Sequence, residues 1–245
     1  GTVLTRAELD AIAAEAERVD AVVVTDEVYE RLTFDDAEHI PLATLPGMRE
    51  RTITISSAGK TFSLTGWKIG WASGPADLIE AVLAVKQFLT YSGGAPFQPA
   101  IARALDDGEA DIEGLRSSLD ERRELLLEGL ADVGFPTVRP SGTYFVCADA
   151  SPFIHGERAD ASPFIHGERA DASPFLSSDI ADGAAFARWL PEAAGVACVP
   201  LSAFCREGSQ AAESLKNWVR FTFVKDEATL RTAIERLRAR FGSGS

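Results

Sequence analysis

The residue of this chain with the most informative surroundings is Lys60, in the segment SSAGKTFSLTGWKIGW at 56–71. It follows a strand-like run at 52–55 and lies in a turn of small residues, with Ser57 three residues before it and Lys68 eight residues after it. A lysine amine can attack a carbonyl carbon, and a hydroxyl and a second ammonium are groups that hold a phosphate. A lysine in a surface turn is more often a solvated side chain, so the chemical interpretation needs support from other segments.

The segment AVVVTDEVYE at 21–30 supplies that support. Its four apolar residues predict a buried parallel strand, and Asp26 follows at the carboxyl end, where ligands bind in open α/β sheets. By itself Asp26 is an ordinary strand-end acid. However, a carboxylate there can pair with a pyridine nitrogen, and the hydroxyl of Tyr29 can donate to a phenolic oxygen. Together with Lys60, these groups indicate pyridoxal 5'-phosphate, a cofactor that a lysine holds covalently.

A third segment, NWVRFTFV at 217–224, predicts a strand with Arg220 in its middle. A charged side chain in an apolar run is costly unless an anion pairs with it. The planar guanidinium binds a carboxylate through two parallel hydrogen bonds, which suits the α-carboxylate of an amino acid. A structural ion pair is the alternative. The other two segments favour substrate binding.

The elements that must position these residues alternate between helix and strand in the first part of the chain, which predicts an α/β fold with a mostly parallel sheet. A capping box at Thr5 and Glu8 opens a helix with Leu9, Ile12, Ala16 and Val19 on one face. The later part predicts an α+β region. The expected strands are 21–25, 52–55, 68–72, 143–147, 196–199 and 218–224, and the expected helices are 75–88, one from 93–100 toward 105, 111–133, 183–194 and 226–240.

Composition excludes some classes of partner. The formal charge of −13 opposes binding to nucleic acid and to anionic membranes. Three cysteines, Cys147, Cys198 and Cys205, are too few for a disulfide framework, which indicates a reducing cytoplasm. No apolar run approaches membrane-spanning length.

One region repeats itself. ADASPFIHGER occurs at 148–158 and 159–169 and begins again at 170–175. Such a short identical period indicates a tandem duplication rather than a repeat architecture. The spacing of His155 and His166 matches no common ligand motif, so no metal site is expected. We expect the insertion at 148–175 to form an exposed loop.

Six segments carry a resemblance to a known family, namely TDEVYE (25–30), SSAGKTFSLTGWKIGW (56–71), GGAPFQPA (93–100), SGTYFVCAD (141–149), GVACVPLSAFC (195–205) and VRFTFVKDEATL (219–230). Together they resemble fold-type I, class I/II aminotransferases, in the branch of the kynurenine/glutamine and N-succinyldiaminopimelate enzymes. The resemblance implies a cofactor site in which Lys60 binds pyridoxal 5'-phosphate, Asp26 pairs with its ring nitrogen, Tyr29 contacts its phenolic oxygen, and Ser57 and Lys68 contact its phosphate. It also implies that Arg220 binds the substrate carboxylate. Many relatives have arginine at the position of Lys68, and lysine lacks the bidentate fork.

The resemblance further implies the domain organisation. We expect the C-terminal part of the large cofactor-binding domain at 1–108, with a boundary near 106–108, a small α+β domain at 109–241 and a flexible tail at 242–245. The family carries roughly 150 further residues before this point, so the chain is expected to be N-terminally truncated.

The expected activity is amino-group transfer between an L-amino acid and a 2-oxo acid, in a cytoplasmic homodimer. N-succinyldiaminopimelate and glutamate, a pair from lysine biosynthesis, are the candidate substrates. Tyr91 either serves a partner's site or is a packed aromatic residue. Two other functions stay open: a carbon–sulfur β-lyase on the same scaffold, and an inactive fragment or scaffold without a complete cofactor site.

Overall fold

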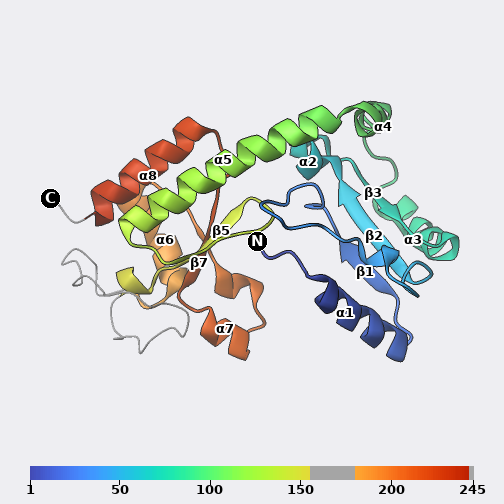
Figure 1. Cartoon of the computed structure of the whole chain (residues 1–245), viewed down its shortest axis with the longest axis horizontal. Helices are drawn as coiled ribbons and strands as arrows, with labels where there is room; N and C mark the ends of the chain where they lie inside the picture. The colour runs from blue at the N-terminus through green and yellow to red at the C-terminus, as the bar shows by residue number, and fades with distance from the viewer. Residues whose placement is uncertain (155–179, 243–245) are drawn as a thin grey trace. The chain divides into compact units, whose positions relative to one another are not determined.

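The computed structural model describes residues 1–154 and 180–242 (Figure 1). The chain divides into two compact units. The N-terminal unit comprises Thr2–Ser118 and Ser141–Thr143, and the C-terminal unit comprises Leu119–Pro140, Tyr144–Ser245 and Gly1. His155 and His166 lie outside the described residues, as does most of the predicted exposed loop at 148–175. For the first residues of that loop the prediction was wrong, because Ala148 belongs to a strand, and Ala148, Ala150 and Phe153 are buried.

The sheet of the N-terminal unit has three strands in the order β1 (Val23–Asp26), β2 (Thr52–Ser57) and β3 (Gly70–Ser73). Strands β1 and β2 are parallel, and β3 is antiparallel to β2. The helices of this unit are α1 (Arg6–Arg18), α2 (Ala58–Thr61), α3 (Ala76–Leu89) and α4 (Gln98–Asp107). The predicted alternation is observed in part, because α1 precedes β1 and α2 lies between β2 and β3, whereas a 3₁₀ helix (Leu42–Thr44) lies between β1 and β2 and α4 follows α3 directly.

Helix α1 begins with the predicted capping box, in which Thr5 and Glu8 exchange hydrogen bonds. Its buried residues are Leu9, Ala13 and Ala16. The predicted face was wrong in part, because Ile12 is 40% exposed and Val19 is 50% exposed. The three buried residues, at positions i, i+4 and i+7 of the helix, form the stripe that packs against Leu42, Leu45 and Met48.

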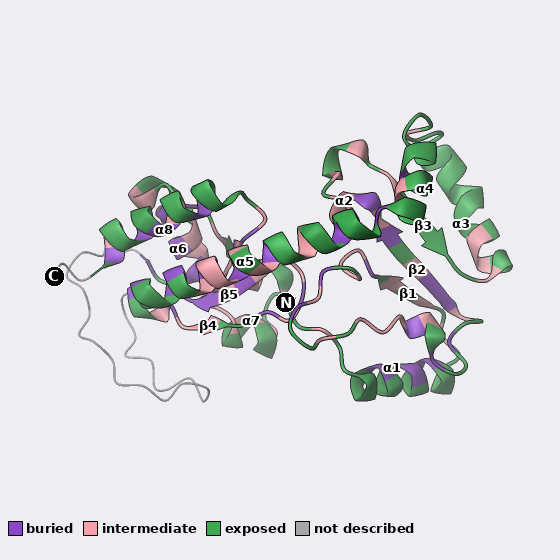
Figure 2. Ribbon diagram, turned by 45° about the horizontal axis from the view of Figure 1, so that its top comes forward, coloured by how far each residue is buried: buried purple, intermediate pink, exposed green. Residues whose placement is uncertain are grey.

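Several apolar side chains of the N-terminal unit are exposed. Val22, directly before β1, and Val24 within it are 54% and 59% exposed. Helix α3 has no buried residue although most of its residues are apolar. In Figure 2 most of α3 has the colour of exposed residues, and a short part has the colour of intermediate burial.

The C-terminal unit contains an antiparallel sheet in the order β4 (Thr137–Val138), β5 (Phe145–Asp149), β7 (Trp218–Thr222) and β6 (Val199–Pro200). Its helices are α6 (Gly183–Ala194), α7 (Gln210–Ser214) and α8 (Glu227–Phe241). The predicted α+β character is confirmed. The two-residue strand β4 was not predicted, because so short a strand has no periodicity to read.

The core of the C-terminal unit is aromatic. The ring of Phe135 lies 4.3 Å from that of Phe153, 5.6 Å from Phe221 and 6.1 Å from Phe241, measured between centroids. In the same unit α8 runs close beside α5 (Glu109–Val133; Figure 1). A Cβ at Gly129 of α5 would lie 2.5 Å from Cδ1 of Ile234, so only glycine permits this approach.

Helix α5 contributes residues to both units. The sequence-based boundary at 106–108 coincides with the junction between α4 and α5, whereas the two compact units divide inside α5, between Ser118 and Leu119. In its first turns Glu109 pairs with Arg31, and Arg116 donates to the carbonyl of Thr33, which ties these turns to the N-terminal unit. None of the described helices combines the length and the apolar character needed to cross a bilayer.

Candidate functional site

The sheet of the N-terminal unit brings several of the predicted site residues to one edge. Asp26 is the last residue of β1 and Ser57 is the last residue of β2. The two strands are parallel and Asp26 pairs with Ile55, so both polar side chains lie where the strands end. Asp26 is exposed and Ser57 is half-buried. This is the edge at which open α/β sheets bind ligands.

Both lysines lie next to that edge. Lys60 is in the short helix α2, which begins directly after Ser57. Lys68 ends a 3₁₀ helix (Thr65–Trp67) in the left-handed conformation, with φ 57° and ψ 38°. Since β3 is antiparallel to β2 and Gly70 pairs with Ser57, Lys68 enters the sheet beside the end of β2. A lysine with positive φ is uncommon, and such residues cluster at functional sites.

Close backbone approach makes this edge compact. A Cβ at Gly70 would lie 2.9 Å from the carbonyl oxygen of Ser56, so β3 could not approach β2 with a larger residue there. A Cβ at Gly59 would lie 3.5 Å from Oγ of Ser57. The backbone of Gly59 therefore lies close to the serine hydroxyl.

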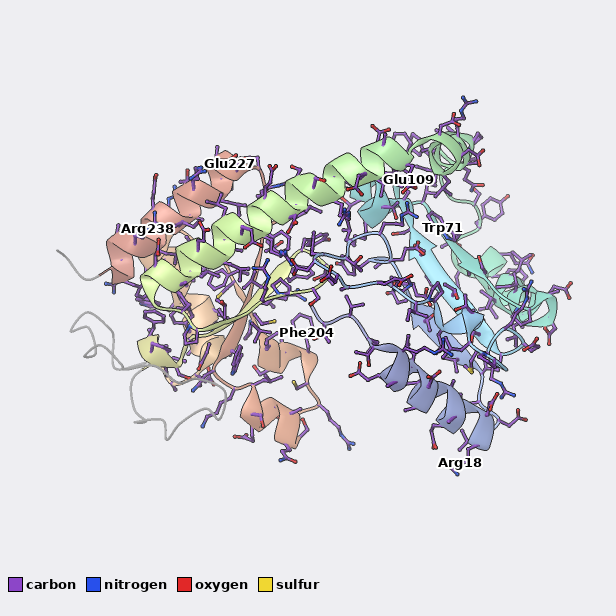
Figure 3. The ribbon with its side chains drawn as sticks, viewed as in Figure 1. Arg18, Trp71, Glu109, Phe204, Glu227 and Arg238 are labelled. Carbon is purple, nitrogen blue, oxygen red and sulfur yellow. The ribbon has the colours of Figure 1, made fainter. Side chains whose placement is uncertain are left out.

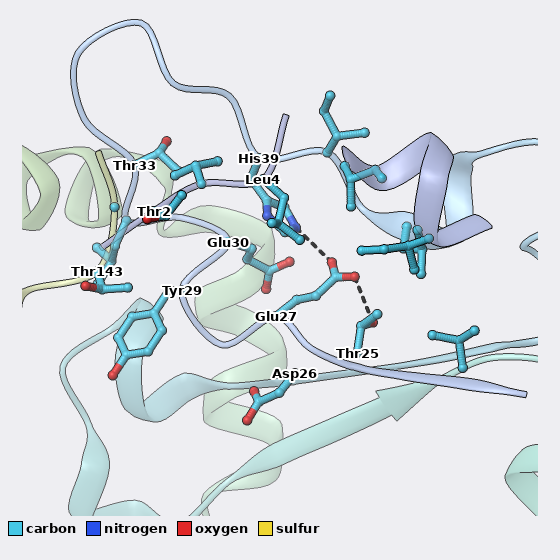
Figure 4. Close-up of a pocket in the computed structure, with 18 of the residues that line it drawn as sticks. Thr2, Leu4, Thr25, Asp26, Glu27, Tyr29, Glu30, Thr33, His39 and Thr143 are labelled. Atoms are coloured by element: carbon cyan, nitrogen blue, oxygen red, sulfur yellow. Dashed lines mark hydrogen bonds and ion pairs between the residues drawn. The ribbon is translucent and has the colours of Figure 1, made fainter. Parts of the chain in front are cut away.

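A cavity of about 470 Å³ opens beside β1 and the loop after it. Asp26 and Tyr29 line it, together with Glu27, Glu30 and His39, whereas Ser57, Lys60 and Lys68 do not. In Figure 4 the carboxylate of Asp26 and the hydroxyl of Tyr29 both point away from the pair formed by Glu27 and His39.

Glu27 and His39 form a polar pair inside this cavity. Nε2 of His39 lies 2.8 Å from a carboxylate oxygen of the buried Glu27, and the hydroxyl of Thr25 donates to the other carboxylate oxygen at 2.8 Å (Figure 4). Burial by itself raises the pKa of Glu27. The hydrogen bonds from His39 and Thr25 and the charge interaction with His39 outweigh burial, so the pKa of Glu27 lies below its ordinary value.

Glu30 adds a third potential metal ligand, since its carboxylate and the ligand atoms of Glu27 and His39 lie within 4.8 Å of one another. Each of these side chains has a protein partner, because the hydroxyl of the buried Ser56 donates to Glu30 at 2.6 Å. We interpret the group as a structural hydrogen-bond network that fixes the chain after β1.

Arg220 is in the middle of β7, as predicted, and belongs to the C-terminal unit. Its guanidinium carbon lies 3.9 Å from the ring centroid of Phe145 and 4.4 Å from that of Phe204. Phe204 extends from a 3₁₀ helix (Leu201–Phe204) that follows β6 (Figure 3). In the part of the chain that the structure describes, no hydrogen bond or ion pair engages the Arg220 side chain.

The structure thus groups five of the six predicted residues, Asp26, Tyr29, Ser57, Lys60 and Lys68, in the N-terminal unit. Tyr91, which follows α3, is 93% exposed and has a φ of 59°.

Sequence reasoning missed the Glu27–His39 pair and the two rings at Arg220. Both features depend on contacts between segments that are distant in the sequence. The only usable signal was the predicted strand at 143–147, which contains Phe145.

Comparison with known proteins gives a consistent result. The family model for class I and II aminotransferases matches residues 1–237. The chain is 49% identical over 241 residues to a probable N-succinyldiaminopimelate aminotransferase of Mycobacterium tuberculosis, covering 97% of the chain and 54% of that protein. It is 38% identical over 246 residues to kynurenine–oxoglutarate transaminase 3 of Mus musculus, covering 98% of the chain and 50% of that protein.

A solved structure supports the same relationship. The chain superposes on N-succinyldiaminopimelate aminotransferase from Mycobacterium tuberculosis with a TM-score of 0.83 and 48% identity, covering 97% of the chain and 54% of that structure. The chain therefore spans about half of the length of the curated relatives that it matches.

Proposed function

Because the chain belongs to the class I and II aminotransferase family, we propose that it forms part of a pyridoxal 5'-phosphate enzyme that transfers an amino group from an L-amino acid to a 2-oxo acid. The observation that carries this proposal is the grouping of a carboxylate, a hydroxyl and two lysines where β1 and β2 end. The proposal concerns the activity of the whole protein.

The residues at the edge fit the cofactor chemically. The amine of Lys60 suits an aldehyde, and the ammonium group of Lys68 and the hydroxyl of Ser57 suit a phosphate dianion. The carboxylate of Asp26 suits a protonated ring nitrogen. The approach of Gly70 to β2 keeps side-chain bulk away from the serine. When bound, the cofactor supplies an electron sink for the carbanion that forms at the substrate Cα.

Each residue then has a defined task. Lys60 would hold the cofactor, and once the substrate amino group has displaced it, its free Nζ would accept the proton from the substrate Cα as general base. Asp26 keeps the ring nitrogen protonated, and Tyr29 donates to the phenolic oxygen. Ser57 and Lys68 hold the phosphate, where Lys68 acts as a point charge rather than a bidentate fork.

Arg220 is the proposed carboxylate clamp. A half-buried arginine with no protein anion among the described residues has its hydrogen-bonding capacity available for a ligand. Its bidentate geometry suits the α-carboxylate and would fix the orientation of the Cα–H bond.

Sequence identity to the named relatives favours one pair of substrates. N-succinyldiaminopimelate with glutamate is the proposed pair, in lysine biosynthesis, because relatives named for N-succinyldiaminopimelate have the higher identity, 49% against 38% for the mouse kynurenine–oxoglutarate transaminase. We further propose a homodimer in the cytoplasm. All three cysteines are free thiols, which is compatible with a reducing compartment.

The proposal is tested by covalent labelling of the 245-residue chain. The chain is incubated with pyridoxal 5'-phosphate, reduced with borohydride and mapped by peptide mass spectrometry. We expect the label to concentrate at Lys60 and to disappear from that peptide in Lys60→Ala.

Lys86→Ala is the matched control, because Lys86 lies on the exposed helix α3 and donates to Thr90, away from the sheet edge. An equal distribution of label over Lys60, Lys86 and the other lysines would show that the edge does not select the cofactor and would refute the proposal.

A further inference from the structure

Arg220 has two aromatic neighbours whose presence its proposed role in binding a carboxylate does not explain. Two ring faces, from Phe145 and Phe204, lie against one guanidinium group, at 3.9 Å and 4.4 Å from its central carbon. The two rings come from different elements, β5 and the 3₁₀ helix after β6. No carboxylate of the described residues pairs with this arginine.

The strand register explains how the rings meet the guanidinium. Cys147 of β5 pairs directly with Arg220, so the two side chains lie on the same face of the sheet. Phe145 is two residues from Cys147 and therefore shares that face. On the other side of β7, Val199 of β6 also pairs with Arg220, and the chain continues from β6 into the turn that carries Phe204.

The rings affect what the guanidinium can bind. Its N–H groups lie in the guanidinium plane, and an aromatic face attracts the cation without using any of them. A ring that stacks on the guanidinium would therefore leave its N–H edge available while it restricts approach to the guanidinium face that it covers. A planar carboxylate can meet that edge with both oxygens. A tetrahedral anion must place a third oxygen out of the plane, toward a ring.

We infer that Phe145 and Phe204 are positioning residues that hold the Arg220 guanidinium edge-on to its ligand and make it select planar carboxylates over tetrahedral anions. This inference rests on the proposed function, in which the ligand is the α-carboxylate of the substrate. Neither ring is assigned contact with the reacting atoms, because each acts through Arg220.

A purely structural role does not account for Phe204. Its side chain is 59% exposed, so it contributes little to the apolar core, yet its ring lies over the arginine. An exposed aromatic ring in that place is better explained by the cation that it holds than by burial of its own surface.

The test measures binding of two small probes to the full 245-residue chain. Propionate and ethanesulfonate have the same charge and the same ethyl group but differ in the geometry of the anion. The Nε–Hε resonance of Arg220, assigned with Arg220→Lys, reports binding by NMR titration. We expect the wild-type chain to bind propionate more tightly than ethanesulfonate.

Phe204→Leu is the informative variant, because the exposed position tolerates it. Loss of one cation–π contact should weaken propionate binding by about threefold to tenfold. The preference for propionate should also fall, since one face of the guanidinium becomes open. Phe204→Tyr keeps the ring and should retain both the affinity and the preference, which loss of general packing would not produce.

The failures of the two proposals are distinguishable. If neither probe shifts the Arg220 resonance in the wild-type chain, then Arg220 is not the carboxylate clamp, and both the clamp and the inference fail. If propionate binds at Arg220 but Phe204→Leu leaves its affinity and the probe preference unchanged, the positioning role alone is overturned. Phe145→Leu, checked for folding by circular dichroism, repeats the measurement at the second ring.

Discussion

The two units of this chain place their large apolar side chains differently. In the C-terminal unit, Phe135, Phe186 and Phe223 are almost completely buried, with 2%, 0% and 0% of their surfaces exposed. In the N-terminal unit, Phe88 and Leu89 at the end of α3 are 83% and 79% exposed. The C-terminal unit thus completes an aromatic core from its own residues, whereas the N-terminal unit leaves part of its apolar surface in water.

The N-terminal unit also contains polar networks. Thr25, Glu27 and His39 form one network, and Ser56 with Glu30 forms another, both beside the sheet edge that carries the proposed site. The proposed cofactor-binding residues thus lie in the unit with these two networks, whereas the aromatic core and Arg220 lie in the other unit. This contrast predicts that the two units respond differently to substitution and to pH.

The largest difference in stability is expected between substitutions of a buried and an exposed phenylalanine. Phe135→Ala removes the ring that contacts Phe153, Phe221 and Phe241 and should destabilise the C-terminal unit by about 4 kcal/mol. Phe88→Ala changes an exposed side chain and should alter stability by less than about 0.5 kcal/mol. Hydrogen exchange read by mass spectrometry follows each unit separately during denaturation. Similar effects of the two substitutions would contradict the contrast between the units.

The sequence predicted the elements wherever hydrophobic periodicity and end signals agreed. The helix expected at 183–194 has those bounds, with Asp182 as its N-cap and Gly195 at its end in the left-handed conformation. On α1 the capping box was readable, but the buried stripe was not, because Ile12 and Ala13 fit the 3.6-residue period almost equally well. Only the position of the Leu42–Met48 segment decides between them.

In the candidate site, too, features set by local sequence were predictable and features set by tertiary contacts were not. The strand-end position of Asp26 and the mid-strand position of Arg220 follow from local sequence pattern. The contact between Glu27 and His39, and the rings around Arg220, depend on how distant segments come together. The left-handed backbone of Lys68 had no local signal either, since neither glycine nor asparagine marks the position.

The second prediction concerns the polar network and pH. Because His39 and Thr25 hold the pKa of Glu27 below its ordinary value, the folded state binds this proton more weakly than the unfolded chain does. The resulting stabilisation is present above the ordinary glutamate pKa of about 4.3 and is lost as the pH falls through the lowered pKa. Glu27→Gln should lower the stability of the N-terminal unit by about 2 kcal/mol at pH 7 and should flatten this acid dependence.

Denaturant titrations between pH 3 and pH 7 test this prediction. The exposed Glu50 is the matched control in the same unit, and Glu50→Gln should leave the acid profile close to that of the wild type. An unchanged acid profile in Glu27→Gln would mean that the Glu27–His39 pair does not couple folding of this unit to protonation.

The smallest effect is expected at the N-terminal caps of two helices, one in each unit. Because the two caps are of the same kind, they allow a direct comparison of the units. The Thr5 hydroxyl accepts from the backbone N–H of Glu8 at the start of α1, and the Asp182 carboxylate accepts from that of Ala185 at the start of α6. Thr5→Ala and Asp182→Ala should each cost about 1 kcal/mol. The Asp182 variant should act at the upper end of the range, since α6 buries Phe186 and Leu190 and its bond measures 2.7 Å, against 3.3 Å at Thr5. If hydrogen exchange instead shows the greater loss of protection in α1, then local capping, rather than the packed core, limits the stability of the N-terminal unit.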